Sequence, residues 1–259
     1  MSLAMSSPER SASNHGPIVT ESTTDADREV AIVDAFVYLS DTLVADYDVI
    51  EFLHFLTERC VEFSAVDEAG VMLAAPSGHL QAVASSSERS RLLELFELQN
   101  HDGPCLDAYR SGTVVSSDDL ALDRDRWPTF APQALDVGFR AVHSVPLKLR
   151  DDVIGALNLL RVDTGGVTER DAKVLRALSD IATVGILQER LLSQGPAEAS
   201  GLQTALASRI LIEQAKGIVA ERNDLQIDEA FDKLRTYARH NGLRLTVAAT
   251  GVINRTIAL

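Results

Sequence analysis

The sequence has few cysteines and no long apolar run. Among 259 residues there are two cysteines, Cys60 and Cys105, and no hydrophobic signal region. Two thiols in such a chain are typical of a reduced, cytoplasmic protein and not of a disulfide-stapled scaffold. No run of 18 apolar residues is present, although a membrane-spanning helix needs about that many. We therefore expect a cytoplasmic protein with no membrane partner.

Several motifs that carry chemistry are also missing. The sequence has six histidines: His15, His54, His79, His101, His143 and His240. They do not show the paired Cys and His spacing of zinc sites, so we predict no metal. No GxxxxGK[ST] segment is present to cradle phosphates. No receiver domain with a phosphoacceptor aspartate is recognisable, which argues against direct phosphorelay input.

Positive charge is scarce but unevenly distributed. The formal net charge is −14, which by itself argues against a nucleic-acid partner because phosphate binding depends on Lys and Arg. From residue 200 onward, however, the chain contains eight Lys or Arg and six Asp or Glu, so this part has a net charge of +2 and residues 1–199 have a net charge of −16. Such asymmetry indicates that the C-terminal end is the one suited to nucleic acid.

Helices are predicted after a polar N-terminal segment. Residues 1–27 are rich in Ser, Thr and small polar side chains and lack the apolar content that ordering requires, so we expect disorder. Helical apolar spacing follows in 28–43 and in 48–62. A long helix is predicted over 168–192, with Thr168 as its N-cap.

Two antiparallel hairpins are predicted between these helices. The runs 70–75 and 80–85 flank a Pro-Ser-Gly-His turn, and the β-branched-rich runs 140–149 and 153–162 flank Arg-Asp-Asp. A brief strand at 113–116 and two short helices, one over 90–98 and one beginning at Pro104, complete this region. Without βαβ alternation, the class is α+β around an antiparallel sheet.

Residues 30–190 resemble a GAF domain. The resemblance rests on the order of these elements, on DGPCLDAYRSG at 102–112, on Trp127-Pro128 and on VPLKLRDDVIGALNLLRV at 145–162. It implies a sensor domain over 28–193, with a concave pocket for a small-molecule ligand of unknown identity. Cys105 and His143 are the candidate pocket residues. Pro196 breaks the preceding helix, which indicates a linker over 194–200.

Residues 209–253 resemble the ANTAR domain, a three-helix module that binds RNA and controls transcription termination. The matching residues are Arg209, Glu-Gln-Ala-Lys-Gly at 213–217, Asp-Glu-Ala-Phe at 228–231, Leu234-Arg235 and Ala238. The resemblance implies an all-α bundle over 201–259. The first two helices are expected over 202–221 and 227–238, with Phe231 as the main core anchor of the second. The third is expected to begin after Thr246, which is its predicted N-cap.

The first of these helices has two apolar rows. The row Leu211, Ala215, Ile218 and Arg222 is assigned to the bundle core, and the row Leu202, Leu206 and Ile210 to a dimer seam. A buried bundle helix without a partner is the alternative. Gly217 inside this helix costs roughly 1 kcal/mol relative to Ala, so the close approach of another helix or of a phosphate backbone is expected there.

The resemblance carries RNA contacts over to five residues. They are Lys216, Arg235, Arg239, Asn241 and Arg244. Such a group of donors suits phosphates and loop bases, whereas a solvated charged face is the plainer interpretation. The chain departs from the family pattern at Asp224, Gln226 and Gly242, which puts the loop contacts in question. Asn223 and Asn241 are expected to compensate, because Asn tolerates left-handed geometry.

The leading hypothesis is a non-enzymatic, signal-responsive antiterminator. It is expected to bind RNA hairpin loops in nascent transcripts as a homodimer. One alternative is a redox enzyme or sensor acting through Cys105, whose position at a helix start favours a thiolate; a buried apolar role is the plainer reading of that residue. A GAF-related family reduces free methionine sulfoxide, but it uses several cysteines. The other alternative is a protein-binding dimeric scaffold.

Overall fold

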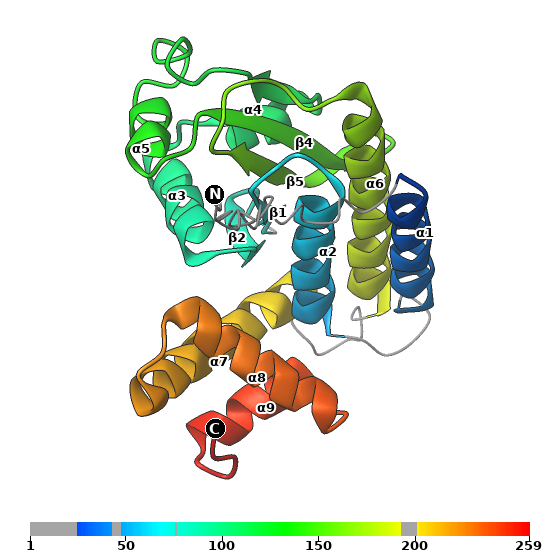
Figure 1. The fold of residues 1–259 in the computed structure, drawn as a ribbon, viewed down its shortest axis with the longest axis vertical. Coiled ribbons are helices and arrows are strands. Elements are labelled where there is room, and N and C mark those ends of the chain that lie inside the picture. The colour runs from blue at the N-terminus through cyan, green and yellow to red at the C-terminus, as the bar shows by residue number, and fades with distance from the viewer. Residues whose placement is uncertain (1–24, 43–47, 76, 193–200) are drawn as a thin grey trace, which may run out of the picture.

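The computed structural model describes residues 25–42, 48–75, 77–192 and 201–259, with side chains for 27–41, 48–75, 77–188 and 207–259. The chain forms an α+β N-terminal domain and a C-terminal bundle of three helices (Figure 1). The predicted linker at 194–200 lies outside the described residues, as does most of the N-terminal segment.

One five-stranded sheet forms the centre of the N-terminal domain. Its strands are β1 (Glu68–Ala74), β2 (Leu80–Ser85), β3 (Val115–Ser117), β4 (Ala141–Leu149) and β5 (Asp152–Arg161). They are ordered β2-β1-β5-β4-β3, and every neighbouring pair is antiparallel. The two predicted hairpins are β1–β2 and β4–β5, so the predicted α+β class is confirmed.

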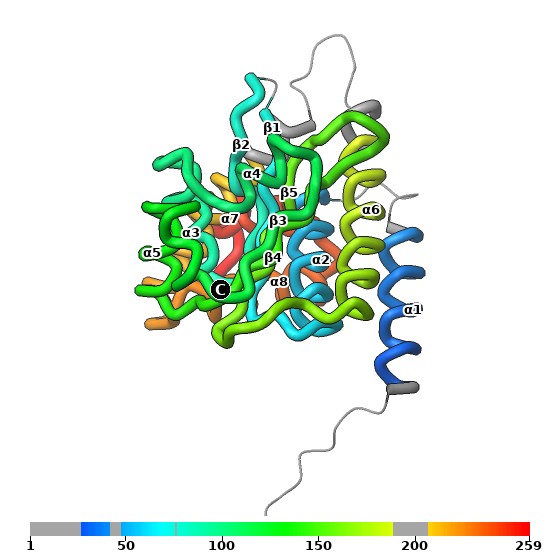
Figure 2. Tube along the Cα trace, turned by 90° about the horizontal axis from the view of Figure 1, so that it is seen from above, coloured from blue at the N-terminus to red at the C-terminus, as the bar shows by residue number. Residues whose placement is uncertain are grey.

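Helices cover both faces of this sheet, and α1 lies outermost (Figure 2). One side holds α1 (Asp25–Thr42), α2 (Val49–Phe63) and α6 (Glu169–Leu192); the other holds α3 (Glu88–Asn100), α4 (Pro104–Ser111) and α5 (Phe130–Asp136). Side chains along β5 alternate between the two faces of the sheet. Leu157 and Leu159 pack against the layer of α1, α2 and α6, and Ala156 and Leu160 pack against the layer of α3, α4 and α5. The seven-residue α5 was not predicted, because it is too short to show helical periodicity.

The layer between the sheet and α3 contains two buried carboxyl groups. Glu97 Oε1 accepts hydrogen bonds from the backbone N–H groups of Cys105 (2.7 Å) and Leu106 (3.0 Å), and so caps α4 where Gly103 has no side chain to do it. Glu94 Oε2 accepts from Ser85 Oγ at 2.7 Å. Burial raises the pKa of Glu97 to about 8 and that of Glu94 to about 7.

The C-terminal bundle consists of α7 (Gly201–Asn223), α8 (Ile227–His240) and α9 (Leu245–Ile253). Ala215 is buried as predicted, but its buried neighbours on α7 are Ile212 and Val219. Leu211 and Ile218 are half-buried and Arg222 is exposed. Two adjacent rows of side chains on α7 are apolar, so helical periodicity alone does not determine which row is buried in the bundle core. The helices that pack against α7 determine it.

The helix ends of the bundle differ from the prediction. Arg244, and not Thr246, is the N-cap of α9, which begins at Leu245. Asp224 (φ 53°) and Gly242 (φ 60°) take the left-handed positions themselves. The expected compensation by the two asparagines is therefore not needed. Their side-chain amides instead donate to the carbonyls of the preceding turn, Asn223 to Val219 (2.8 Å) and Asn241 to Tyr237 (2.8 Å).

Gly217 lies exposed in the middle of α7. A Cβ placed there would meet no atom within 4 Å apart from its chain neighbours and the backbone of its own helix. Within the part of the chain that the structure describes, no other helix therefore approaches Gly217 closely.

Replacing Gly217 by Ala should stabilise the protein. The change removes the entropic cost of Gly at a helical site with free space, which is worth roughly 1 kcal/mol and raises the melting temperature by about 2–4 °C in a chain of this size. Thermal unfolding measures this. The matched control is Gly251→Ala in α9, where the new Cβ would lie 2.4 Å from Ile257 Cδ1 and should lower the melting temperature. A destabilised Gly217→Ala variant would contradict the description of this site.

Glu97→Gln should change how stability depends on pH. The folded pKa of Glu97, about 8, exceeds its ordinary value of 4.5, so the folded state holds more protons and loses stability as pH rises between these values. The Gln side chain retains an oxygen to cap α4 and cannot ionise. We expect the free energy of unfolding to fall less steeply from pH 5 to 8 than in the wild type. Glu62→Gln, at an exposed position, should leave the slope unchanged, and an equal slope in both variants would refute this account.

Candidate functional site

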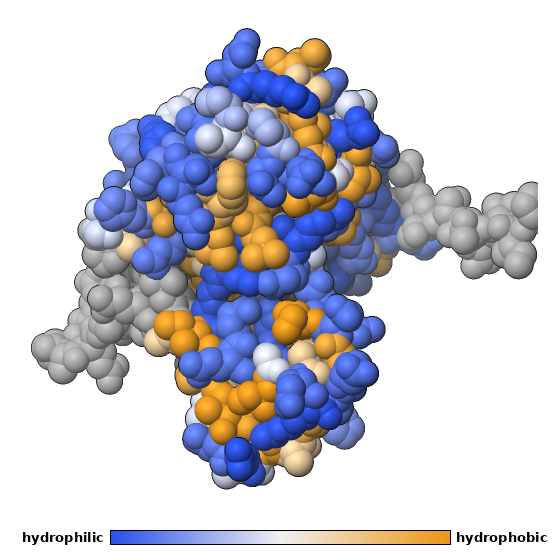
Figure 3. Space-filling model, turned by 90° about the vertical axis from the view of Figure 1, so that its left-hand side faces the viewer, coloured by the Kyte–Doolittle hydropathy of each residue, from blue (hydrophilic) through white to orange (hydrophobic). Residues whose placement is uncertain are grey.

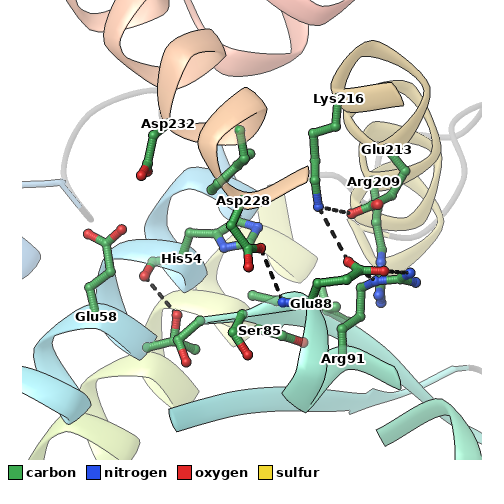
Figure 4. A pocket seen from close by; sticks show the side chains of 16 residues that line it. His54, Glu58, Ser85, Glu88, Arg91, Arg209, Glu213, Lys216, Asp228 and Asp232 are labelled. Carbon is green, nitrogen blue, oxygen red and sulfur yellow. Dashed lines mark hydrogen bonds and ion pairs between the residues drawn. The ribbon is translucent and has the colours of Figure 1, made fainter. Parts of the chain in front are cut away.

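Four basic side chains of α7 and α8 face the N-terminal domain: Arg209, Lys216, Arg235 and Arg239. Phe231, Arg235 and Arg239 follow the i, i+4, i+8 spacing that places them on one face of α8, and Lys216 reaches the same region from α7. Opposite them lie α2 and the start of α3. Figure 4 shows Lys216 and Arg209 above Glu88 and Arg91, with His54 and Glu58 beside them.

Ion pairs join these two surfaces. Arg235 forms an ion pair with Glu58, and Arg239 Nε lies 3.3 Å from Glu51 Oε1. Lys216 Nζ lies 3.9 Å from Glu88 Oε2, and 3.0 Å from Glu213 Oε1 within its own helix. The side chains of Lys216 and Arg235 are only 8% and 15% exposed. Their charges are therefore neutralised by neighbouring carboxylates and mostly removed from water.

Phe231 lies at the centre of this contact. Its ring centroid is 4.5 Å from that of His54, while Lys216 Nζ and Arg235 Cζ lie 5.4 and 5.6 Å from the ring. Phe231 was expected to anchor the bundle core, but it is half-buried and contributes mainly to the junction. Burial, followed by the charges of Lys216 and Arg235, lowers the pKa of His54 to about 3, so its imidazole is neutral at physiological pH.

Each domain also supplies an aspartate to a helix start of the other. Asp228 Oδ1 of α8 accepts from the Glu88 N–H at the beginning of α3, at 3.1 Å. Asp48 Oδ1 caps α2 by accepting from Ile50 N–H at 2.9 Å, and its Oδ2 lies 3.4 Å from Thr246 N in the first turn of α9. Carboxylates are favourable at helix N-termini. These contacts therefore set the orientation of the bundle on the N-terminal domain.

A small cavity of about 70 Å³ remains at the junction. It is lined by side chains from both domains, among them His54, Arg91, Arg209 and Asp232. Burial lowers the pKa of Arg209. The surface of the junction between the two lobes is mainly hydrophilic (Figure 3).

The structure thus brings three of the five predicted RNA contacts together, Lys216, Arg235 and Arg239, and it does so against the N-terminal domain. Asn241 and Arg244 lie apart from them and are exposed, at the end of α8 and the start of α9. The sequence did not predict the side chains of α2 that contact these cations and Phe231. Glu51, His54 and Glu58 share the i, i+3, i+7 spacing of one α2 face, but a polar helix face normally meets water.

The two predicted pocket residues are not brought together. Cys105 is fully buried in the layer between the sheet and α3 to α5. His143 is half-buried on β4, where alternation places it with Val145 and Leu147 on the opposite face. The buried apolar role of Cys105 agrees with the structure, and the alternative of a thiolate does not. Burial, together with the charges of Glu97 and Glu94, raises the pKa of this thiol well above its ordinary value.

One residue of the predicted dimer seam can be placed. Ile210 is 60% exposed on α7, while the side chains of Leu202 and Leu206 lie outside the described residues. Val247 of α9 is also exposed, and apolar surface is visible on the lower lobe in Figure 3. Among the described residues, no group of three or more His, Cys, Asp or Glu is arranged to hold a metal ion. Within the same part of the chain, no helix combines the length and apolar character needed to cross a membrane.

Comparisons with known proteins agree with this architecture. A GAF domain model matches residues 46–186, which is more than half of the chain, and an ANTAR domain model matches residues 200–253. No curated protein matches the chain.

Solved structures share the fold of the N-terminal domain. The GAF domain from a phosphoenolpyruvate-protein phosphotransferase of Coxiella burnetii aligns with a TM-score of 0.50 and 11% identity, covering 63% of this chain and 96% of that one. Free methionine-R-sulfoxide reductase from Neisseria meningitidis, in complex with its substrate, aligns with a TM-score of 0.50 and 17% identity, covering 66% and 97%. At these identities the likeness shows the fold alone. Because the GAF domain model matches more than half of its residues, the chain belongs to the GAF domain family, and it carries an ANTAR domain over residues 200–253.

Proposed function

We propose that this protein is a signal-responsive, RNA-binding regulator of transcription antitermination. The main support for this proposal is the ANTAR bundle, in which the basic side chains Lys216, Arg235 and Arg239 lie on one side. The GAF domain is the sensory part, and a small molecule is its signal. RNA hairpin loops in nascent transcripts are the target, because exposed loop bases and flexible phosphates suit such donors.

RNA contacts extend from these cations to the exposed end of α8. Arg239, Asn241 and Arg244 offer donors to phosphates and bases, and Gly217 leaves open space on α7 for a phosphate backbone. The net charge of +2 in this part is small for an RNA-binding module, which favours recognition by a few placed contacts over a broad basic surface.

A redox enzyme acting through Cys105 is less well supported. Its thiol is fully buried and its pKa is raised, so little thiolate is available to attack a substrate. The second cysteine, Cys60, is also buried, and burial raises its pKa to about 12. The fold likeness to a methionine sulfoxide reductase does not supply the missing nucleophile.

Arg235→Ala/Arg239→Ala should weaken RNA binding and its dependence on salt. Each phosphate contact contributes about 0.7 to the slope of log affinity against log salt for single-stranded RNA, so two lost contacts lower the slope by about 1.4. Filter binding of hairpin RNAs from a randomised-loop library, over a range of KCl concentrations, measures this. Arg170→Ala/Arg176→Ala on α6 removes the same charge far from the bundle and should have little effect. Salt-independent binding, or a folded double variant that binds like the control, would contradict the function.

We also propose that two bundles pair through the Leu202, Leu206 and Ile210 row. Ile210→Asp places a charge on this apolar row and should convert a dimer to a monomer at micromolar concentration, as sedimentation velocity would show. Val247→Asp, on the exposed side of α9, is the matched control and should leave the dimer intact. A wild-type protein that is monomeric with and without RNA would eliminate the dimer.

A further inference from the structure

The same cations that the proposed function assigns to RNA are occupied by carboxylates of the GAF domain. Arg235 pairs with Glu58 and Arg239 with Glu51. Lys216, which is bound to Glu213 of its own helix, lies 3.9 Å from Glu88, a carboxylate that Arg91 also binds. We propose that Glu51, Glu58 and Glu88 form an acidic docking surface that competes with RNA phosphates for these three side chains. The docked arrangement is then the RNA-free state of the protein. This proposal rests on the proposed function.

Burial makes the competition exclusive for two of the three cations, whereas the side chain of Arg239 is 46% exposed. The side chains of Lys216 and Arg235 are 8% and 15% exposed in the docked arrangement, so a phosphate cannot reach them while α8 lies on α2. A carboxylate and a phosphate offer the same kind of anionic oxygens to a guanidinium or ammonium group. RNA and the GAF surface therefore bind the same donors in turn, and binding RNA through them requires the domains to separate.

The contact has the character of a specific but reversible interface. Its orientation is set by Asp228 at the start of α3, by Asp48 at the start of α9 and by the tilted contact between the rings of Phe231 and His54. Its other contacts include ion pairs, which individually contribute little to stability when they are partly exposed. Apolar packing of α7 against α2, α6 and β2 joins them, because the buried apolar residues of the two domains form one cluster. Inter-domain surfaces within one chain generally permit relative domain motion.

The docking surface is built on the same helix that packs against the sheet. Opposite Glu51 and Glu58, the buried side of α2 presents Leu53, Leu56 and Cys60 to the GAF core. A ligand that favours a different packing of this core shifts the position of the acidic face, provided that it binds the two arrangements with different affinity. Ligand binding in the GAF domain and RNA binding by the bundle are thereby coupled through α2.

The test neutralises the docking surface in the full chain. Glu51→Gln/Glu58→Gln/Glu88→Gln keeps side-chain size and removes three negative charges. The matched control, Glu29→Gln/Glu62→Gln/Glu169→Gln, makes the same charge change on helices of the GAF domain, at glutamates that pair with Arg170, Arg59 and Lys173 of that domain. Hairpin RNAs are selected from a randomised-loop library on the wild type and on both variants in parallel. Each selected RNA is then measured against all three proteins, and small-angle X-ray scattering gives each protein's radius of gyration.

We expect the docking-surface variant to bind RNA about tenfold or more tightly than both the wild type and the control, because affinity scales with the fraction of undocked protein. Its radius of gyration should also increase. If the wild type binds RNA and the two variants bind it with equal affinity, the proposed competition is wrong and the RNA-binding function stands. An expanded docking-surface variant with no RNA binding by any protein would overturn both the RNA function and the competition that rests on it. Tighter RNA binding without expansion would also overturn the proposal, because the gain would then come from charge alone.

Discussion

Lys216 and Arg235 are charged side chains that the fold has largely removed from water, and a charge in that situation needs a carboxylate beside it. Glu58 supplies one for Arg235, and Glu213 and Glu88 supply two for Lys216. The position of the bundle follows from this requirement. Because α2 carries Glu58 and α3 begins at Glu88, these carboxylates hold the bundle on the side of the N-terminal domain where α7 also contacts α2, α6 and β2.

The contact between the rings of His54 and Phe231 and the aspartates at the helix starts add direction to this attraction. Ion pairs alone tolerate many orientations, whereas a hydrogen bond from a helix N-terminus requires an acceptor near its axis. Asp48 and Asp228 satisfy this requirement in opposite senses across the junction. His54 fits between the cations because its imidazole is neutral. Polar groups thus contribute direction to a junction that also contains Phe231 and the apolar packing of α7 against α2, α6 and β2.

The GAF interior shows a different use of buried carboxyl groups. Glu97 serves as the cap of α4 because Gly103 cannot, and its low-polarity surroundings favour the protonated form near neutral pH. The same surroundings raise the pKa of Cys105, the residue immediately inside that cap. A helix start that in water would favour a thiolate therefore holds an inert thiol here, because desolvation outweighs the helix dipole.

Local patterns in the sequence were enough to determine most element types, though not the short helix α5, together with the two hairpins and the three-helix character of the C-terminal end. Alternation, helical spacing and turn residues act between near neighbours, and the residues that carry the GAF and ANTAR resemblances lie within short segments. The cations of α7 and α8 could be named from the same motif. Their partners could not, because Glu51 and Glu58 lie more than 170 residues away from Arg235 and Arg239 and look like an ordinary solvated helix face. Tertiary structure alone decided which apolar row of α7 enters the core and that the basic face meets an acidic one, because both depend on surfaces that only folding brings together.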